Sequence, residues 1–332
     1  MTDAFWQAAE IDARPCVDLE QLSIGLRVAR AVQVAHKIGV FDLLLVAPHD
    51  APAIAAACDT QPGPTERLLV FLASTGLVFR QPDGCFRLTG EGRAAFDPDS
   101  PRYYGHGLAH QTAFWDRWHN LEQTLRQPPA TGTGAPHMPP EIHRTFVMAM
   151  HDYSIRGRAQ WLAGNVELTG RRHLLDLGGG PGTYCIALCQ RFPELRATIF
   201  DLPNTEPLAL ANAARFGLRE RIGFVGGDFD HDDLGSGYDC ALVSNVLHGA
   251  DHGSAARLRR VREVLPSGGL LVVQDFLLDD DRNGPLEAAM FHCHVGAYSV
   301  SEMLAAIAAA GFRDAALRGR GPAGNGLVTA VA

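Results

Sequence analysis

A run of glycines directly follows a short apolar stretch in the second half of the chain. Leu174-Leu175-Asp176-Leu177 leads into Gly178-Gly179-Gly180-Pro181-Gly182, and Thr183 opens a stretch with helical spacing. Glycine lets a backbone approach a ligand closely, and the following helix presents its first amide N–H groups. The spacing Gly178-x-Gly180-x-Gly182 is neither the dinucleotide pattern nor a P-loop. It predicts a cofactor-binding turn, with a merely tight turn as the alternative.

Acidic and aromatic residues end the apolar stretches that come next. Asp201 lies 25 positions after Asp176, where its carboxylate can accept hydrogen bonds from both hydroxyls of a ribose. Asp228 and Phe229 follow a third stretch and suit the amine and the ring of an adenine, and a fourth stretch ends in Ser244-Asn245-Val246-Leu247-His248. Because the carboxyl ends of parallel strands meet at one crevice, we expect these side chains to form one site.

Strand-like and helical stretches alternate from residue 171 onward, as the positioning of such a site requires. The predicted strands cover residues 173–177, 197–201, 222–225, 240–244 and 270–274, and the predicted helices cover residues 183–191, 207–216 and 254–265. This alternation is typical of a doubly wound parallel sheet with helices on both faces. The predicted fold class is α/β, with a Rossmann-like C-terminal sheet.

The N-terminal region has a different pattern, in which helices precede a hairpin. Apolar residues at 24, 28, 31, 35 and 38 form one stripe of a helix that ends near Gly39. Shorter helices are expected over residues 52–58 and 65–75, and a β-hairpin over residues 77–80 and 85–89. This order is typical of a winged helix, so the N-terminal domain is predicted to be mainly helical.

A winged helix can serve DNA binding or it can serve dimerisation, and the charge of the chain distinguishes between the two. Residues 65–72, in the recognition position, carry one basic side chain, Arg67, beside Glu66. The chain has 29 Lys+Arg against 37 Asp+Glu, a net charge of -8, and no run of basic residues. Nucleic acid and membrane are therefore not expected partners, because an electrostatic attraction is missing. The winged helix is expected to serve dimerisation or packing.

Composition and spacing also suggest a location and a domain division. The first residues lack a signal-peptide pattern and no apolar run nears the roughly 20 residues of a membrane span, so we expect a cytoplasmic protein. The seven cysteines contain no Cys-x-x-Cys pair and are expected to be mostly buried. The expected parts are a winged-helix domain (1–105), a helical connector and substrate lid (106–165) with a Pro/Gly loop at 127–140, and a catalytic domain (166–332).

The motifs resemble a known family. Four stretches are similar to the class I S-adenosylmethionine-dependent methyltransferases, and within them to small-molecule O-methyltransferases with an N-terminal winged-helix dimerisation domain. They are Asp176-Leu177-Gly178-Gly179-Gly180-Pro181-Gly182, Phe200-Asp201-Leu202-Pro203, Gly227-Asp228-Phe229 and the stretch 272–279. The resemblance covers residues 31–312. It implies a homodimeric enzyme that uses S-adenosylmethionine and a small-molecule acceptor.

The resemblance also implies roles for single residues. The cofactor-binding set comprises Gly178 and Gly180 at the methionine part, Asp201 at the ribose, Asp228 and Phe229 at the adenine, and Leu202 and Ser244 beside them. His248 falls at the position of the general base, which takes a phenolic or enolic proton, and Asp275 at that of an acid flanking the base. A second flanking acid has no counterpart after Phe291, so Asp275 is expected to orient His248 alone.

An unusual stretch, His292-Cys293-His294, leaves a second reaction open. Relatives that methylate the β-carbon of α-keto acids have a second His in this segment and a metal that chelates the keto acid. By that resemblance His248 and His292, with His294 as a substitute, bind a divalent or ferric metal ion that stabilises an enolate. Two further classes, a ligand-sensing winged-helix regulator and an NAD-binding reductase, are alternatives to a methyltransferase.

Overall fold

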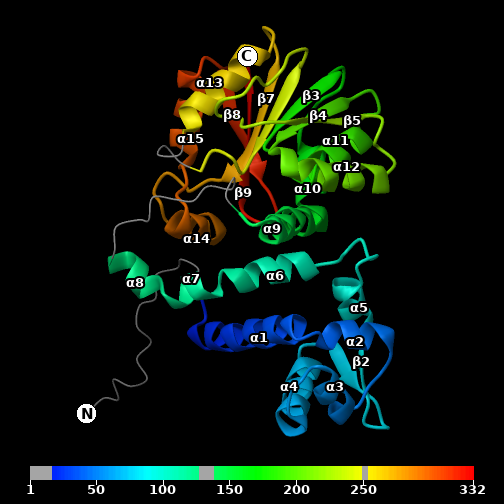
Figure 1. The fold of residues 1–332 in the computed structure, drawn as a ribbon. Coiled ribbons are helices and arrows are strands. Elements are labelled where there is room, and N and C mark those ends of the chain that lie inside the picture. The colour runs from blue at the N-terminus through cyan, green and yellow to red at the C-terminus, as the bar shows by residue number, and fades with distance from the viewer. Residues whose placement is uncertain (1–16, 127–137, 249–252) are drawn as a thin grey trace, which may run out of the picture. The chain divides into compact units, whose positions relative to one another are not determined.

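The structure, a computed structural model, describes residues 17–126, 138–248 and 253–332. It divides into two compact units, Met1–Asp97 and Pro98–Ala332, which are described separately below. Figure 1 labels the elements of both units.

The first unit has the helices followed by a hairpin that the sequence predicts. Its elements are α1 (Leu19–Lys37), α2 (Val40–Val46), α3 (Ala51–Ala57), α4 (Pro62–Ser74), β1 (Val78–Arg80), β2 (Phe86–Leu88) and α5 (Gly90–Phe96). Helix α4 begins three residues before the predicted Thr65, because prolines at 62 and 64 fit a first helical turn, where no N–H is needed. The core includes Phe41, whose ring stacks on that of Phe96 with centroids 3.8 Å apart.

The second unit begins with a layer of helices. They are α6 (Gly105–Ala113), α7 (Trp115–His119), α8 (Leu121–Arg126), α9 (Pro140–Tyr153) and α10 (Ala159–Asn165). Helices α9 and α10 are joined by a π-helical kink, Ser154–Arg158, where Gly157 has a φ of 114°. Most of the predicted Pro/Gly loop, residues 127–137, lies outside the described residues. Helix α6 packs on α9, and Asp152 of α9 accepts the N–H of Gly107 at 2.9 Å.

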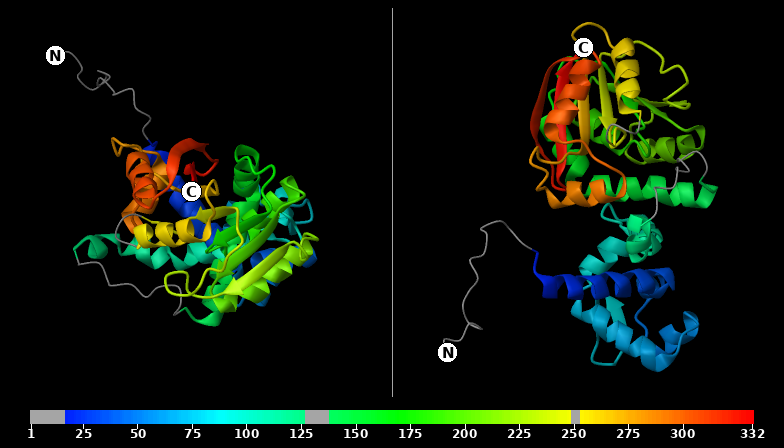
Figure 2. Two further views of the ribbon diagram at one scale, coloured as in Figure 1. Left: turned by 90° about the horizontal axis from the view of Figure 1, so that it is seen from above. Right: turned by 90° about the vertical axis from the view of Figure 1, so that its left-hand side faces the viewer.

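A seven-stranded sheet forms the centre of the second unit, in the order β5-β4-β3-β6-β7-β9-β8 (Figures 1 and 2). Its strands are β3 (His173–Leu177), β4 (Arg196–Asp201), β5 (Ile222–Gly226), β6 (Cys240–Ser244), β7 (Leu270–Phe276), β8 (Arg313–Arg320) and β9 (Asn325–Val331). Strands β3 to β7 are parallel, which confirms the predicted α/β fold. Strand β9 runs antiparallel to both neighbours, β7 and β8.

Helices cover both faces of this sheet. They are α11 (Thr183–Arg191), α12 (Glu206–Arg215), α13 (Ser254–Val264), α14 (Leu286–His294) and α15 (Val300–Ala309), with a 3-10 turn at Pro203–Thr205. One core cluster packs α13 and α15 on Leu175 and Val243, and another packs α10 and α11 on Leu174 and Leu242. Because alternate residues of β3 and β6 enter opposite cores, these central strands are largely apolar runs, which made them recognisable in the sequence.

Helix α9 is joined to the sheet layer by a buried imidazole. The Nδ1 of His151 lies 2.8 Å from the Thr183 hydroxyl and 3.0 Å from the Asn212 amide nitrogen. Because the amide can only donate, Nδ1 must accept, and a proton on Nδ1 would oppose it. Burial lowers the pKa of His151 to about 4. The contact therefore needs the neutral ring.

We expect the free energy of unfolding to fall as the pH is lowered from about 6.5 toward 4.5. His151 gains a proton in the unfolded chain near its ordinary pKa and in the folded chain only near 4, so acid favours unfolding, by on the order of 2 kcal/mol. Urea unfolding at a series of pH values measures this. His151→Gln should flatten the slope and His119→Gln, on an exposed histidine, should not; equal slopes in all three proteins would contradict the assignment.

Candidate active site

A cavity of about 570 Å³ opens at the carboxyl ends of β3, β4, β5 and β6. Its lining includes eight of the residues singled out in the sequence: Gly178, Gly180, Asp201, Leu202, Asp228, Phe229, Ser244 and His248. Helix α9 and the kink after it supply the opposite wall, which includes Phe146, Val147, Met150 and Arg158. The volume lies within the usual range of small-molecule sites. We refer to this cavity as the crevice.

Left-handed backbone shapes the glycine turn. Gly178, Gly180 and Gly182 have φ angles of 67°, 50° and 70°, a region that other residues enter only with strain. A Cβ on Gly178 would lie 2.8 Å from the Cγ2 of Val246, and one on Gly182 would lie 2.6 Å from the Cδ1 of Ile199. A Cβ on Gly180 would have nothing within 4 Å. The turn therefore packs tightly on two sides and leaves Gly180 unobstructed.

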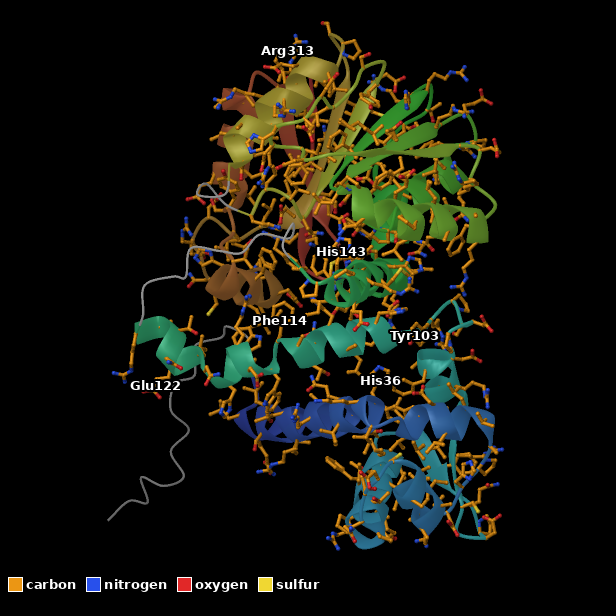
Figure 3. All side chains as sticks on the ribbon, in the orientation of Figure 1. His36, Tyr103, Phe114, Glu122, His143 and Arg313 are labelled. Carbon is orange, nitrogen blue, oxygen red and sulfur yellow. The ribbon has the colours of Figure 1, made fainter. Side chains whose placement is uncertain are left out.

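Asp201 holds the glycine turn from the end of β4. Its Oδ2 accepts the N–H of Gly180 at 2.8 Å, and its Oδ1 accepts the N–H of Leu202 at 2.7 Å and the hydroxyl of Thr205 at 3.1 Å. Burial raises the pKa of Asp201, and these donors oppose the rise. The Nε2 of His143 lies 3.3 Å from the same Thr205 hydroxyl. Figure 3 shows His143 between α9 and the sheet.

The loop after β5 carries the adenine-binding candidates. The N–H of Asp230 donates to Oδ1 of Asp228 at 2.9 Å, so this loop is closed by its own side chains. The guanidinium carbon of Arg257 lies 4.8 Å from the centroid of the Phe229 ring, a cation–π geometry. Arg257 also lines the crevice. Sequence reasoning missed both Arg257 and His143, since each comes from a helix far along the chain from the motif it contacts.

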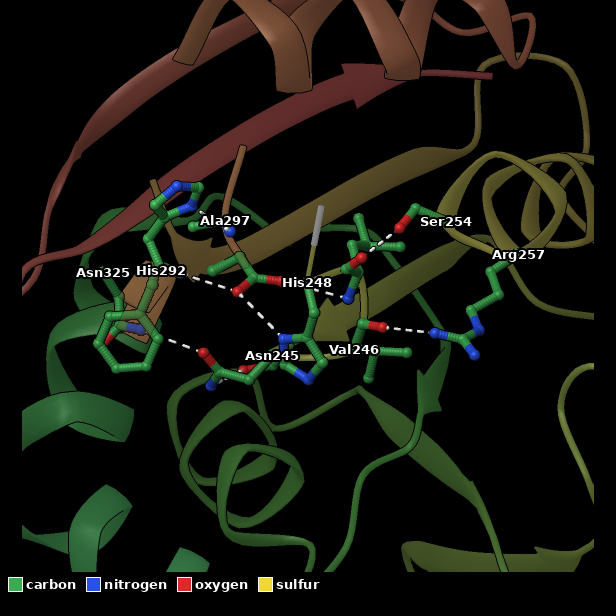
Figure 4. Close-up of polar contacts among 12 residues, drawn as sticks. Asn245, Val246, His248, Ser254, Arg257, His292, Ala297 and Asn325 are labelled. Atoms are coloured by element: carbon green, nitrogen blue, oxygen red, sulfur yellow. Dashed lines mark hydrogen bonds and ion pairs between the residues drawn. The ribbon is translucent and has the colours of Figure 1, made fainter. Parts of the chain in front are cut away.

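Asp275 holds the backbone that carries His248. The carboxylate is 2% exposed; its Oδ1 accepts the N–H of Phe276 at 2.8 Å and its Oδ2 that of Leu247 at 3.2 Å. Oδ1 also lies 3.8 Å from Nδ1 of His248, within ion-pair distance (Figure 4). Burial raises the pKa of Asp275 to about 6, with backbone donors acting against it. Nδ1 is thus the ring nitrogen of His248 that faces the carboxylate.

One aromatic ring packs beside the imidazole, and a second ring stacks on the first. The centroid of the Phe291 ring lies 5.1 Å from that of His248, and the rings of Phe276 and Phe291 stack at 4.6 Å. Together with the apolar residues of α9, these rings suit a flat, apolar molecule beside His248.

His292 does not fit as a metal ligand in this arrangement. Its Nδ1 accepts the N–H of Ala297 at 3.0 Å, and in Figure 4 the His292 ring turns toward Ala297. A neutral ring whose Nδ1 accepts carries its proton on Nε2, so neither nitrogen has a lone pair to offer. The side chain of His294 lies outside the described residues. Where the structure describes side chains, no group of three or more His, Cys, Asp or Glu could hold a metal ion.

A doubly wound sheet in which the last strand of the chain, β9, inserts antiparallel between β7 and β8, and which opens at such a crevice, is the fold of S-adenosylmethionine-dependent methyltransferases. The crystal structure of human N-acetylserotonin methyltransferase with S-adenosylmethionine is similar over 97% of this chain and 99% of its own, with a TM-score of 0.82 and 24% identity. The structure of a mitomycin 7-O-methyltransferase is similar over 95% of this chain and 97% of its own, with a TM-score of 0.78 and 27% identity.

Sequence comparison identifies the family. The O-methyltransferase domain matches residues 130–312, and the O-methyltransferase dimerisation domain matches residues 20–95. The 3-hydroxy-5-methyl-1-naphthoate 3-O-methyltransferase of Streptomyces sahachiroi is 33% identical over 284 residues, which cover 82% of this chain and 80% of that protein. The mitomycin biosynthesis 6-O-methyltransferase of Streptomyces lavendulae is 30% identical over 76% and 75%.

The chain belongs to the O-methyltransferase family and is an S-adenosylmethionine-dependent methyltransferase. This confirms the resemblance, the enzyme class and the cofactor that the sequence motifs indicated. The residue roles stay predictions. Among the described residues, no helix is long and apolar enough to cross a membrane.

Gly178→Ala should weaken the binding of S-adenosylhomocysteine, the product of the cofactor, at least about tenfold. The added methyl group meets Val246 at 2.8 Å and the φ of 67° strains it, so the turn must shift. Calorimetric titration measures the affinity. Gly164→Ala is the matched control, because a Cβ there has nothing within 4 Å. Equal affinities of the two variants would contradict the placement of the turn.

Proposed function

We propose that this enzyme transfers a methyl group to a hydroxyl of a small aromatic molecule, with His248 as the general base. The observation that carries the proposal is the pairing of His248, at the wall of the crevice, with the buried carboxylate of Asp275 3.8 Å away. A carboxylate that orients a neutral imidazole prepares it to accept a proton.

Different residues around the crevice are suited to bind different parts of the cofactor. We infer that Asp201 binds the ribose, that Asp228 and Phe229 bind the adenine, and that the turn with Gly178 and Gly180 accommodates the methionine part; Leu202 and Ser244 line the same cavity. When bound, S-adenosylmethionine supplies an electrophilic methyl group on its sulfonium. Methyl transfer then requires mainly that the acceptor oxygen be held in line with it.

Proton removal is the task left to His248. Its Nε2 takes the hydroxyl proton, and the oxygen keeps the electron pair with which it forms the new bond to carbon. The bond between that carbon and the sulfonium sulfur breaks in the same step, and its electron pair stays on the sulfur of S-adenosylhomocysteine. The positive charge that develops on the imidazole is stabilised by the Asp275 carboxylate. Because Asp275 is fixed by backbone donors, it stays in place while the charge of the ring changes.

An aromatic acceptor is favoured by the walls of the site. Phe291 and Phe276 stack beside His248, and Phe146 and Met150 line the crevice from α9. Relatives named as a naphthoate O-methyltransferase, an O-methyltransferase of mitomycin biosynthesis and a phenazine O-methyltransferase agree with a ring-shaped acceptor and with specialised metabolism. Carbon methylation through His248 and His292 is not favoured, since the Nδ1 of His292 is occupied by Ala297.

His248→Gln should lower the rate of methyl transfer by about 100-fold to 10,000-fold, because the glutamine side chain cannot act as a base. Affinity for S-adenosylhomocysteine should stay within about twofold, since the lost group acts on the acceptor. The assay is release of S-adenosylhomocysteine with a panel of hydroxynaphthoic acids, and His119→Gln is the control.

The same assay separates the two reactions. Wild-type activity should persist after treatment with a chelator. Loss of activity on chelation and its recovery with a divalent metal would contradict the base mechanism and favour the metal-assisted one. Full activity of His248→Gln would contradict both.

We also propose that the enzyme is a homodimer and that nucleic acid is not a partner. The dimerisation domain matches residues 20–95, within the first unit. In α1, Leu19, Leu22 and Leu26 are 76%, 52% and 59% exposed, and their i, i+3, i+7 spacing places them on one face. Exposed apolar stripes of this kind mark interfaces.

Leu22→Asp should convert the dimer to a monomer at low micromolar concentration, because the substitution places a charge in an apolar interface. Sedimentation velocity measures the mass. Leu317→Asp, on a partly exposed leucine of the second unit, is the control and should stay dimeric. A Leu22→Asp protein with the sedimentation coefficient of the wild type would show that this face of α1 is not the interface.

A further inference from the structure

Arg257, on α13, joins two loops that serve different parts of the reaction. Its Nε and Nη2 atoms donate to Oδ1 and Oδ2 of Asp230 at 2.7 and 2.8 Å, which is a two-bond fork. Its Nη1 atom donates to the carbonyl of Val246 at 2.8 Å (Figure 4). Asp230 belongs to the loop after β5, and Val246 lies two residues before His248. One side chain, 15% exposed, therefore touches both loops.

The same guanidinium supports the adenine-binding candidate. It lies 4.8 Å from the centroid of the Phe229 ring. An ideal Cβ on Gly178 would lie 3.5 Å from the Cε1 of Phe229 and 2.8 Å from the Cγ2 of Val246. Phe229 is therefore close to both the glycine turn and the second loop. The guanidinium therefore packs on the ring that is the candidate to contact the adenine.

The segment that carries His248, residues 244–248, depends on outside bonds for its shape. Asn245 and His248 have φ angles of 53° and 40°, in the left-handed region that non-glycine residues adopt uncommonly, although Asn and His do so more often than most. Bonds from outside the segment hold it in this shape. Arg257 donates to the carbonyl of Val246, Ser254 donates to the carbonyl of Leu247, and Asp275 accepts the N–H of Leu247. At Asn245, the carbonyl of Gln274 accepts the N–H and the Asn325 amide donates to Oδ1. Among these partners, Arg257 also reaches the adenine loop.

We propose that Arg257 is a positioning residue that couples occupation of the adenine site to the geometry of the 244–248 segment. The inference rests on the proposed function, since it takes the adenine to bind at Asp228 and Phe229. The path is continuous. Oδ1 of Asp228 accepts the N–H of Asp230, the carboxylate of Asp230 holds the fork of Arg257, and the third nitrogen of Arg257 holds Val246.

Coupling of this kind requires that the bound cofactor favour one geometry over another. An adenine on Phe229 and Asp228 restrains the loop that anchors the fork, so the Val246 carbonyl keeps its partner and the segment stays in place. Without the cofactor the loop has fewer restraints, and the segment relaxes more often. His248 is thus held in its position when the methyl donor is present.

A lysine at position 257 could not reproduce the planar, two-bond contact that the Arg257 guanidinium makes with Asp230. Lysine has a single ammonium group, so it can hold Asp230 or Val246 but cannot make the parallel pair of bonds and the third bond together. Arg257→Lys keeps the charge and removes the bridge. Asp230→Asn removes the negative charge and replaces one of the two acceptors of the fork with a donor, while the Arg257 side chain itself is unchanged.

Hydrogen–deuterium exchange of the full-length protein, with and without saturating S-adenosylhomocysteine, tests the coupling without an acceptor. In the wild type, the ligand should slow exchange in peptides containing residues 244–248 at least about fivefold. In Arg257→Lys and Asp230→Asn, compared at equal ligand occupancy, this protection should fall to less than about twofold. Affinity for the ligand should fall about tenfold in both variants.

Arg262→Lys is the matched control, because Arg262 lies on the same helix and donates to the carbonyls of Leu265 and Gly311 instead. It should keep full protection. Ligand-dependent protection that survives in Arg257→Lys, or that is absent from the wild type although the ligand binds, overturns the coupling and leaves the methyltransferase proposal intact. Failure of the wild type to bind S-adenosylhomocysteine would instead overturn the proposed function. Circular dichroism confirms that each variant is folded.

Discussion

The buried carboxylate of Asp275 is the constraint on which the active site depends. It lies at the end of β7 and holds the chain that leaves the neighbouring strand β6, through the N–H of Leu247, so two strand ends share one anchor. A carboxylate in this position would be costly without donors, and its pKa is raised to about 6 despite them. The backbone N–H groups of Leu247 and Phe276 offset part of this cost, and the carboxylate in turn fixes the loop that carries His248.

Around this anchor, the ends of the other parallel strands place further residues at the same crevice. Asp201, on β4, holds the glycine turn that leaves β3, and the loop after β5 presents Phe229. Parallel strands make this possible because their carboxyl ends lie on the same edge of the sheet. Helix α9 closes the crevice with apolar side chains, and its buried His151 ties that wall to the start of α11. The wall formed by α9 is therefore packed against the helix that follows the glycine turn.

Much of the fold was predictable because its signals are local. The predicted strands at 173–177 and 240–244 and the helix at 183–191 agree with the bounds of β3, β6 and α11, since a strand buried on both faces is a continuous apolar run. The final hairpin was missed. Strand β8, which begins at Arg313, carries charged residues on an edge and gives little strand signal. The prediction of a parallel sheet holds for β3 to β7, and the last two strands pair antiparallel because a short hairpin cannot make a parallel crossover.

The sequence by itself determined the glycine turn, the acids at the strand ends and the histidine after β6, because each of these lies within a few residues of the strand that positions it. It also determined the family, through the same short motifs. Only the tertiary structure decided which groups meet across the chain. The contact of Arg257 with Asp230 and Val246, and the bond that occupies Nδ1 of His292, depend on how helices and loops pack. These contacts join residues that no sequence pattern relates. They arise only when the folded chain brings the residues close together in space.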